Sequence, residues 1–112
     1  MLTATIILFV LAALLGLTVA VQILKKKSTS KGVAIAHGAF GAAGLIVLVL
    51  HAAKNPNQLL TTAIILLVVA ALGGLTVFIN DLRGKVGPVG LVVIHALVAV
   101  SAVVLVLVVA LK

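Results

Sequence analysis

The sequence predicts an all-α integral membrane protein, an up-down four-helix bundle built from two tandem two-helix repeats. Three observations predict this fold. The 112-residue chain is 65% hydrophobic and 8% charged, whereas a soluble domain carries roughly 25% charged residues. Its apolar residues form four runs, each long enough to cross a bilayer as a helix of about 20 residues. Residues 1–54 also align with residues 59–112 without a gap, so one two-span unit occurs twice in a single transmembrane domain, 1–112.

The expected spans are residues 2–24, 32–53, 58–80 and 88–111. Helices are expected because every backbone polar group must be hydrogen-bonded inside lipid. The first run is too long for a signal peptide and no Lys or Arg precedes it, so we expect it to be retained. Pro56 marks the second connection as a turn, and Pro88 fits the first turn of the fourth helix. Short connections make consecutive helices neighbours, which places the second and fourth helices diagonally.

The basic residues predict how the chain sits in the membrane. The net charge is +7, and most of it falls in the first and third connections, with little on the other side. The residues of the first group are Lys25, Lys26, Lys27, Lys31, Arg83 and Lys85; those of the second are Lys54 and Lys112. The positive-inside rule then predicts that these two connections are cytoplasmic and both termini outside. We expect a bacterial or archaeal inner membrane, and no nucleic-acid binding, because topology accounts for the charge.

His37 and His95 are the most informative residues of the chain. Each lies inside an apolar span, and the 58-residue offset of the repeat relates them. Ionisable groups at such depth are rare and usually functional. Two facing imidazoles in a dry bundle are the ligand set of a bis-histidine haem, so we predict that both bind its iron. The alternative is a pair of neutral structural histidines, each satisfied by the other, by threonine or by water.

The second helix carries further candidates on the face of His37. At about 100° per residue, Gly41, Gly44 and His51 share that face. The glycines would let a flat macrocycle approach the backbone, whereas packing of another helix against Gly38, Gly41 and Gly44 is the alternative. His51 is a candidate ligand for a second haem, or an imidazole that reaches the membrane interface.

The first and third helices carry matching candidates. Gly16 and Gly74 would clear space for the macrocycle. Thr18 and Thr76 lie close to the depth of the histidines, where their hydroxyls would bond the non-ligating imidazole nitrogens. Their alternative is a bond to a carbonyl of their own helix.

This arrangement resembles the four-helix, haem-binding core of membrane b-type cytochromes, including the dihaem cytochrome b of quinol-oxidising complexes. In that family, the second and fourth helices each carry two histidines 14 residues apart. His37 and His51 match one pair, His95 matches one member of the other, and Val109 takes the place of the fourth histidine. The resemblance implies non-covalent haem b with low-spin iron, one haem at His37 and His95 and a second at His51 that lacks its partner ligand. The absence of cysteine excludes a covalent c-type haem.

The expected function is therefore one-electron transfer rather than catalysis. A quinol or a partner redox subunit would supply the electron, with the chain acting alone, as a homo-oligomer or as a subunit of a larger redox enzyme. The alternative is a non-catalytic membrane scaffold that binds partner helices. A small multidrug exporter would need a membrane-embedded carboxylate, and the only acid, Asp81, lies at a helix end beside Arg83. There is no paired carboxylate or Ser-His-Asp set for hydrolysis.

Overall fold

The computed structural model describes residues 1–85 and 88–112 and confirms the four-helix prediction. The helices are α1 (Leu2–Leu24), α2 (Lys31–Lys54), α3 (Gln58–Leu82) and α4 (Val89–Ala110). Their ends lie within two residues of the predicted spans, and all four are long and apolar enough to cross a membrane. The molecule measures 42 × 21 × 19 Å, and its length matches a bilayer with headgroups, about 40–45 Å.

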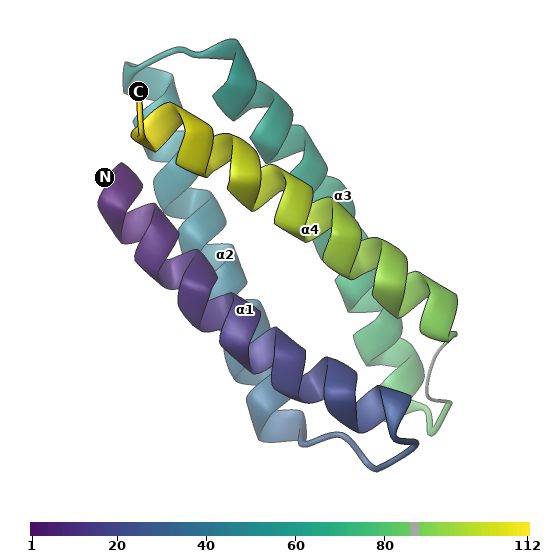
Figure 1. Cartoon of the computed structure of the whole chain (residues 1–112). Helices are drawn as coiled ribbons and strands as arrows, with labels where there is room; N and C mark the ends of the chain where they lie inside the picture. Colours follow the sequence, from purple (N-terminus) through teal and green to yellow (C-terminus); the bar gives the residue numbers. More distant parts are fainter. Residues whose placement is uncertain (86–87) are drawn as a thin grey trace.

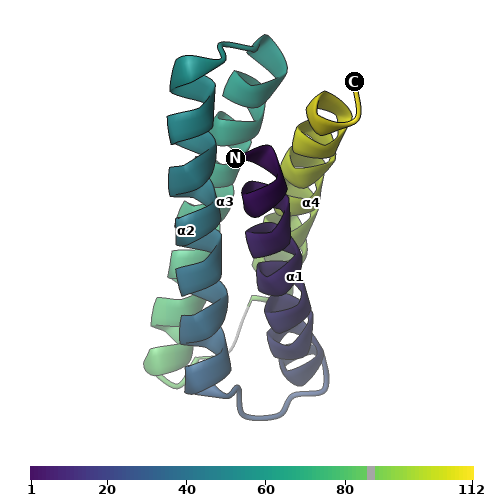
Figure 2. The ribbon, with the colours of Figure 1, turned by 90° about the vertical axis from the view of Figure 1, so that its left-hand side faces the viewer.

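The packing is closest within each half of the chain. α1 packs along α2 and α3 packs along α4, so each sequence repeat forms one helical hairpin (Figure 1). These are the first hairpin (α1 and α2) and the second hairpin (α3 and α4). They meet less closely along α1 and α4 and along α2 and α3, whereas α2 and α4 lie diagonally, as predicted. Figure 2, turned by 90°, shows the first hairpin in front of the second.

Local backbone conformation and capping side chains mark the helix ends in both hairpins. The residue after the C-cap has a positive φ in both α1 and α3, 56° at Lys26 and 78° at Gly84. Glycine takes this conformation without a steric penalty, so the second hairpin carries the better residue for the turn. The side chains of Ser30 and Asn57 cap α2 and α3 by accepting backbone N–H bonds, at 3.3 Å and 2.8 Å.

The four helices are closely packed at the end that carries both termini and the connection between α2 and α3. The buried residues there are Phe9, Leu48, Leu60, Ala63, Leu67, Ala102 and Val106. Many other large apolar side chains point outward, for example Leu14 and Leu72, which are 60% and 62% exposed. Apolar packing thus joins the hairpins at this end, and an apolar outer surface is left for lipid.

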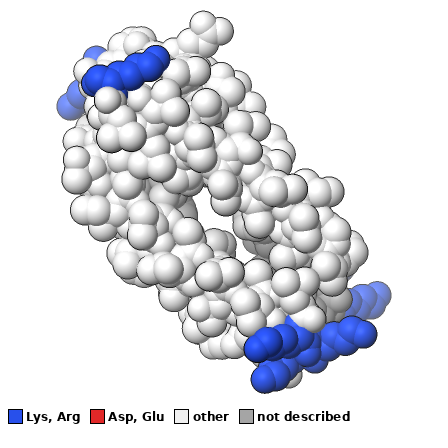
Figure 3. Space-filling model, viewed as in Figure 1, with Lys and Arg blue, Asp and Glu red and all other residues white. Residues whose placement is uncertain are grey.

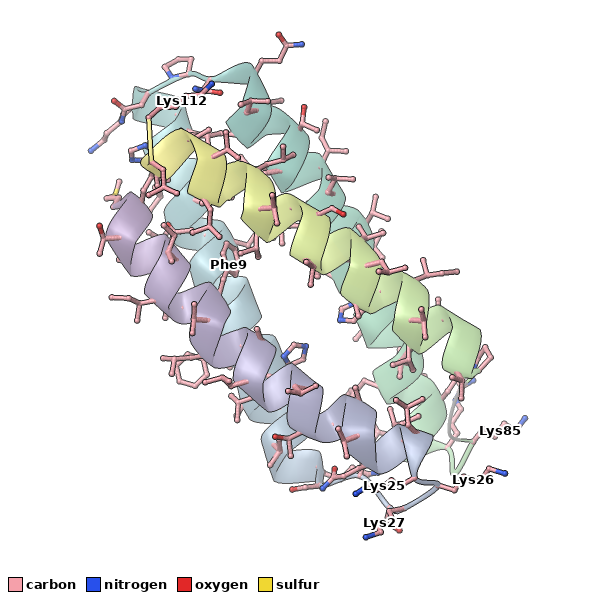
Figure 4. All side chains as sticks on the ribbon, in the orientation of Figure 1. Phe9, Lys25, Lys26, Lys27, Lys85 and Lys112 are labelled. Carbon is pink, nitrogen blue, oxygen red and sulfur yellow. The ribbon has the colours of Figure 1, made fainter. Side chains whose placement is uncertain are left out.

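Most of the positive charge lies at the opposite end, here called the loop end. Figure 3 shows the basic side chains gathered there, with fewer at the other end. Lys25, Lys26, Lys27 and Lys85 project from the loop end and Lys112 from the other (Figure 4). The predicted grouping of charge at one end is confirmed.

Candidate functional site

A cavity of about 940 Å³ lies between the two hairpins. Figure 3 shows a hollow between α1 and α4 in the middle of the bundle. The volume is within the range of small-molecule and cofactor sites, about 300–1,000 Å³. All four helices line the cavity, and its wall is apolar except for Thr29, His37, Asp81 and His95.

The cavity wall follows the sequence repeat. Residues that line it from the first hairpin have counterparts, 58 positions later, that line it from the second. The pairs include Phe9 with Leu67, Ala12 with Ala70, Gly16 with Gly74, His37 with His95 and Gly41 with Ala99. Because both hairpins run the same way, the repeat gives the cavity a pseudo-twofold axis along the bundle.

Each imidazole is anchored to the other helix of its own hairpin. Nδ1 of His37 lies 2.7 Å from the carbonyl oxygen of Ala12 on α1, and Nδ1 of His95 lies 2.6 Å from that of Ala70 on α3. A carbonyl oxygen only accepts, so Nδ1 donates, and in a neutral ring Nε2 then keeps its lone pair. Histidines that bind metals are almost always held in this way. Each Nε2 then has the free lone pair that a metal ligand needs.

Gly16 and Gly74 make this anchoring possible. A Cβ at Gly16 would lie 2.7 Å from Cε1 of His37, and a Cβ at Gly74 would lie 2.7 Å from Cε1 of His95. A helical side chain covers the turn before its own Cα, so the missing side chain of Gly16 uncovers the carbonyl of Ala12. We expected these glycines to clear room for a macrocycle, but the structure places the imidazole rings against them.

The two rings approach each other across the cavity. Their centroids are 6.0 Å apart and their planes are inclined at 83°. With metal–nitrogen bonds of about 2 Å, two imidazoles on opposite sides of one metal ion have centroids roughly 6 Å apart. An edge-to-face pair without a metal covers the same range, about 4.5–7 Å. The spacing is therefore compatible both with one metal ion between the rings and with a metal-free edge-to-face pair.

The donor set fits haem better than a bare metal ion. Among the described residues, no three of the types His, Cys, Asp and Glu come together as a metal-binding group. A structural zinc site takes four ligands, so two imidazoles would be a poor set. Haem brings its own four in-plane nitrogens, and its iron takes only axial ligands from the protein.

The glycines of α2 differ in their surroundings. Gly38 and Gly41 line the cavity, and a Cβ at either position would meet nothing within 4 Å. Gly44 lies outside the cavity wall, where a Cβ would come 2.7 Å from Cε1 of Phe9. Gly44 thus makes room for a phenyl ring in the apolar core rather than for a macrocycle. Gly38 is exposed and Gly41 is half-buried, so the structure leaves the scaffold alternative open at these two positions and closes it at Gly44.

Thr18 and Thr76 do not bond to the imidazoles. Each hydroxyl donates to the carbonyl four residues earlier in its own helix, at 3.1 Å for Thr18 and 2.9 Å for Thr76, and both residues are exposed. The predicted hydrogen bonds to the histidines are replaced by those to the carbonyls of Ala12 and Ala70.

His51 is not part of the cavity wall. Near its end of α2, the apolar core fills the space between the hairpins, and Leu48, Leu60 and Val106 are among its most deeply buried residues. His51 thus lies apart from the site of His37 and His95, and its role as a ligand of a second haem stays a prediction.

A polar cluster that the sequence analysis missed lies at the loop end of the cavity. Oδ2 of Asp81 accepts hydrogen bonds from Nζ of Lys31, at 2.6 Å, and from Oγ1 of Thr29. Nζ of Lys31 also donates to Oγ1 of Thr29 at 3.0 Å. Asp81 lies at the end of α3, as expected, and its carboxylate is buried and pairs with a lysine of the other hairpin. The available signal was that Asp81 is the only acid in a chain of net charge +7.

Comparison of the chain with protein-family models, with curated proteins and with solved structures gives no match. The cavity and its two imidazoles therefore carry the functional assignment.

Proposed function

We propose that this protein is a membrane b-type cytochrome that transfers single electrons, with one haem b between α2 and α4. His37 and His95 would be its axial ligands. One observation carries the proposal: two imidazoles, each held through Nδ1 by a backbone carbonyl, lie 6.0 Å apart in a cavity of about 940 Å³. The bound haem would supply a reversible one-electron couple at its iron.

The protein's own groups would bind, orient and enclose the cofactor. The carbonyls of Ala12 and Ala70 hold each ring in one tautomer and raise the basicity of Nε2. The apolar wall would limit the access of water to the iron, and solvent exclusion is one of the means by which a protein sets a haem potential. Each histidine lies six residues into its helix, about 9 Å from the loop end, so the lysines there are placed to compensate the anionic carboxylates of haem.

The charge distribution supports an orientation in the membrane. We infer that the loop end faces the cytoplasm of a bacterial or archaeal cell, because the basic residues gather there. The electron would come from a membrane quinol or from a partner redox subunit, as the resemblance to b-type cytochromes implies.

Reconstitution with haem tests this function. The full chain, purified and supplied with haem, is expected to give a Soret band that saturates on titration. His37→Ala and His95→Ala should each abolish tight binding, because either change leaves the iron with one protein ligand. His51→Ala is the matched control and should bind like the wild type. A wild-type chain that forms no Soret band, even with excess haem, would favour the scaffold alternative.

A further inference from the structure

The two hairpins are joined at both ends of the cavity, by different means. At the end with the termini they share the apolar core. At the loop end, Asp81 of α3 meets Lys31 of α2 and Thr29 of the preceding connection. This is the one ion pair in residues 1–85 and 88–112, and it links the two hairpins. We call these three residues the clasp.

Each imidazole is fixed to its own hairpin. His37 is bonded to α1 and its ring lies against Gly16, whereas His95 is bonded to α3 and lies against Gly74. A change in the spacing of the hairpins would therefore change the gap between the rings. The apolar core sets that spacing on one side of the histidines, and the clasp sets it on the other.

The repeat does not account for the clasp. The counterpart of Asp81 is Ile23, which is 3% exposed and lines the cavity, and the counterpart of Lys31 is Val89. The two positions that match the ion pair by the repeat thus carry apolar side chains. In this pair the Asp81 carboxylate is buried and the Lys31 side chain is 45% exposed. Loss of hydration at the carboxylate limits the net stability that the pair adds, yet removal of Lys31 leaves a buried charge uncompensated. The pair is better suited to fixing one arrangement of the hairpins than to adding stability.

We propose that Asp81 is a positioning residue, which through Lys31 and Thr29 holds the hairpins at the spacing that lets His37 and His95 bind the two faces of one haem. The part of this proposal that concerns haem rests on the proposed function. The spacing itself is a property of the chain without haem and can be measured separately.

The first experiment measures the spacing in the haem-free protein. The chain has no cysteine, so Leu14→Cys and Leu72→Cys, two exposed repeat counterparts on α1 and α3, can carry spin labels without background. Pulsed electron spin resonance should give a narrow distance distribution in the wild type. Asp81→Asn and Lys31→Gln should each lengthen or broaden it.

Three controls show whether a changed distance distribution is due to loss of the Asp81–Lys31 pair. Lys27→Gln removes the same charge as Lys31→Gln at the same end, but Lys27 has no carboxylate partner among the described residues, so its distribution should stay narrow. The reciprocal exchange, Lys31→Asp with Asp81→Lys, should restore the narrow distribution. Circular dichroism of each variant checks that the helices persist. Lys31→Gln is expected to disturb the fold less than Asp81→Asn, because the Lys31 side chain is 45% exposed. Unchanged distributions in Asp81→Asn and Lys31→Gln would overturn the proposal.

The second experiment repeats the haem titration on the same variants. Haem affinity should fall about tenfold or more in Asp81→Asn and Lys31→Gln, as for other groups that orient a ligand, and stay unchanged in Lys27→Gln. Broadened distances with unchanged haem affinity would overturn the positioning role. If the wild type binds no haem, the proposed function fails, and the distances alone decide whether the clasp holds the hairpins. If haem binds but the distances do not respond, only the clasp proposal fails.

Discussion

At the scale of single residues, a glycine, a backbone carbonyl and an imidazole form the recurring unit of the site. Gly16, the carbonyl of Ala12 and His37 make it once, and their repeat counterparts make it again. The glycine admits the ring, the carbonyl orients it, and the ring presents Nε2. His37 recurs as His95 although the residues beside it differ, whereas Ala12 and Gly16 lie in a stretch that the second repeat keeps almost unchanged.

Adding a methyl group to the unit should weaken haem binding. Gly16→Ala and Gly74→Ala each put a Cβ 2.7 Å from an imidazole carbon, which pushes the ring away from its carbonyl partner. We expect haem affinity to fall by about 10–100-fold in a spectroscopic titration. Alanine favours a helix more than glycine does, so a loss of helix is no explanation.

Gly90→Ala is the control for that substitution. It adds the same methyl group to a glycine of α4 that is not part of the cavity wall, and a Cβ there meets nothing within 4 Å. Equal losses of affinity in Gly16→Ala and Gly90→Ala would contradict the role given to Gly16.

Replacing the two threonines should have little effect on haem. Thr18→Val and Thr76→Val remove hydroxyls that bond only to their own helices on the exposed side. The double variant is therefore expected to keep wild-type haem affinity and spectrum. A shifted spectrum or a tenfold weaker titration would show that these hydroxyls act on the ligands after all.

Part of this residue-scale detail could be predicted from the sequence. His37 and His95 stand out because a polar ring in an apolar span is rare. The roles of Ala12 and Ala70 could not be predicted, because every residue has a backbone carbonyl and residue type does not show which one is uncovered. Gly16 and Gly74 were the residues that indicated these carbonyls, since each glycine lies one turn after the carbonyl that it exposes.

At the scale of elements, the two hairpins fill the same position between their helices with different pairs of side chains. Phe9 of α1 packs against Gly44 of α2 in the first hairpin. The counterparts in the second hairpin are Leu67 and Ala102, both buried. A larger ring opposite a glycine and a smaller side chain opposite an alanine fill a comparable volume, as close packing requires.

This exchange predicts a compensating pair of substitutions. Gly44→Ala alone should lower the free energy of unfolding by about 1–3 kcal/mol, because its Cβ would overlap the phenyl ring of Phe9. Phe9→Leu combined with Gly44→Ala reproduces the second hairpin and should recover much of that loss. Unfolding of the four proteins of this double-mutant cycle in mixed detergent micelles measures the coupling, and strictly additive effects would contradict the packing match.

The elements themselves were predictable to within two residues because hydropathy and the turn residues mark where a span ends. The cavity between the hairpins could not be predicted from the sequence. The helices are apolar on nearly every face, so sequence periodicity does not distinguish a wall of the cavity from a surface that faces lipid.

At the scale of the whole molecule, the repeat produces both the cavity and its orientation. Each repeat has two spans, so both hairpins insert the same way and face each other across the cavity. The even number of spans also brings both termini to one end and the basic connections to the other (Figure 1).

Single cysteines test the orientation in cells. Ser28→Cys lies in the connection between α1 and α2, and Asn57→Cys lies between α2 and α3, in a chain without other cysteines. A membrane-impermeant thiol reagent should label intact cells through position 57 and not through position 28. The reverse pattern would place the basic end outside and remove the support for a cytoplasmic loop end.

The haem content and spectrum of the purified chain, after haem is supplied, test the central claim most directly. We predict one haem per chain and a six-coordinate, low-spin spectrum in both the oxidised and the reduced state, because two imidazoles would hold the iron. No bound haem, or a five-coordinate high-spin spectrum, would contradict the proposal that His37 and His95 share one iron.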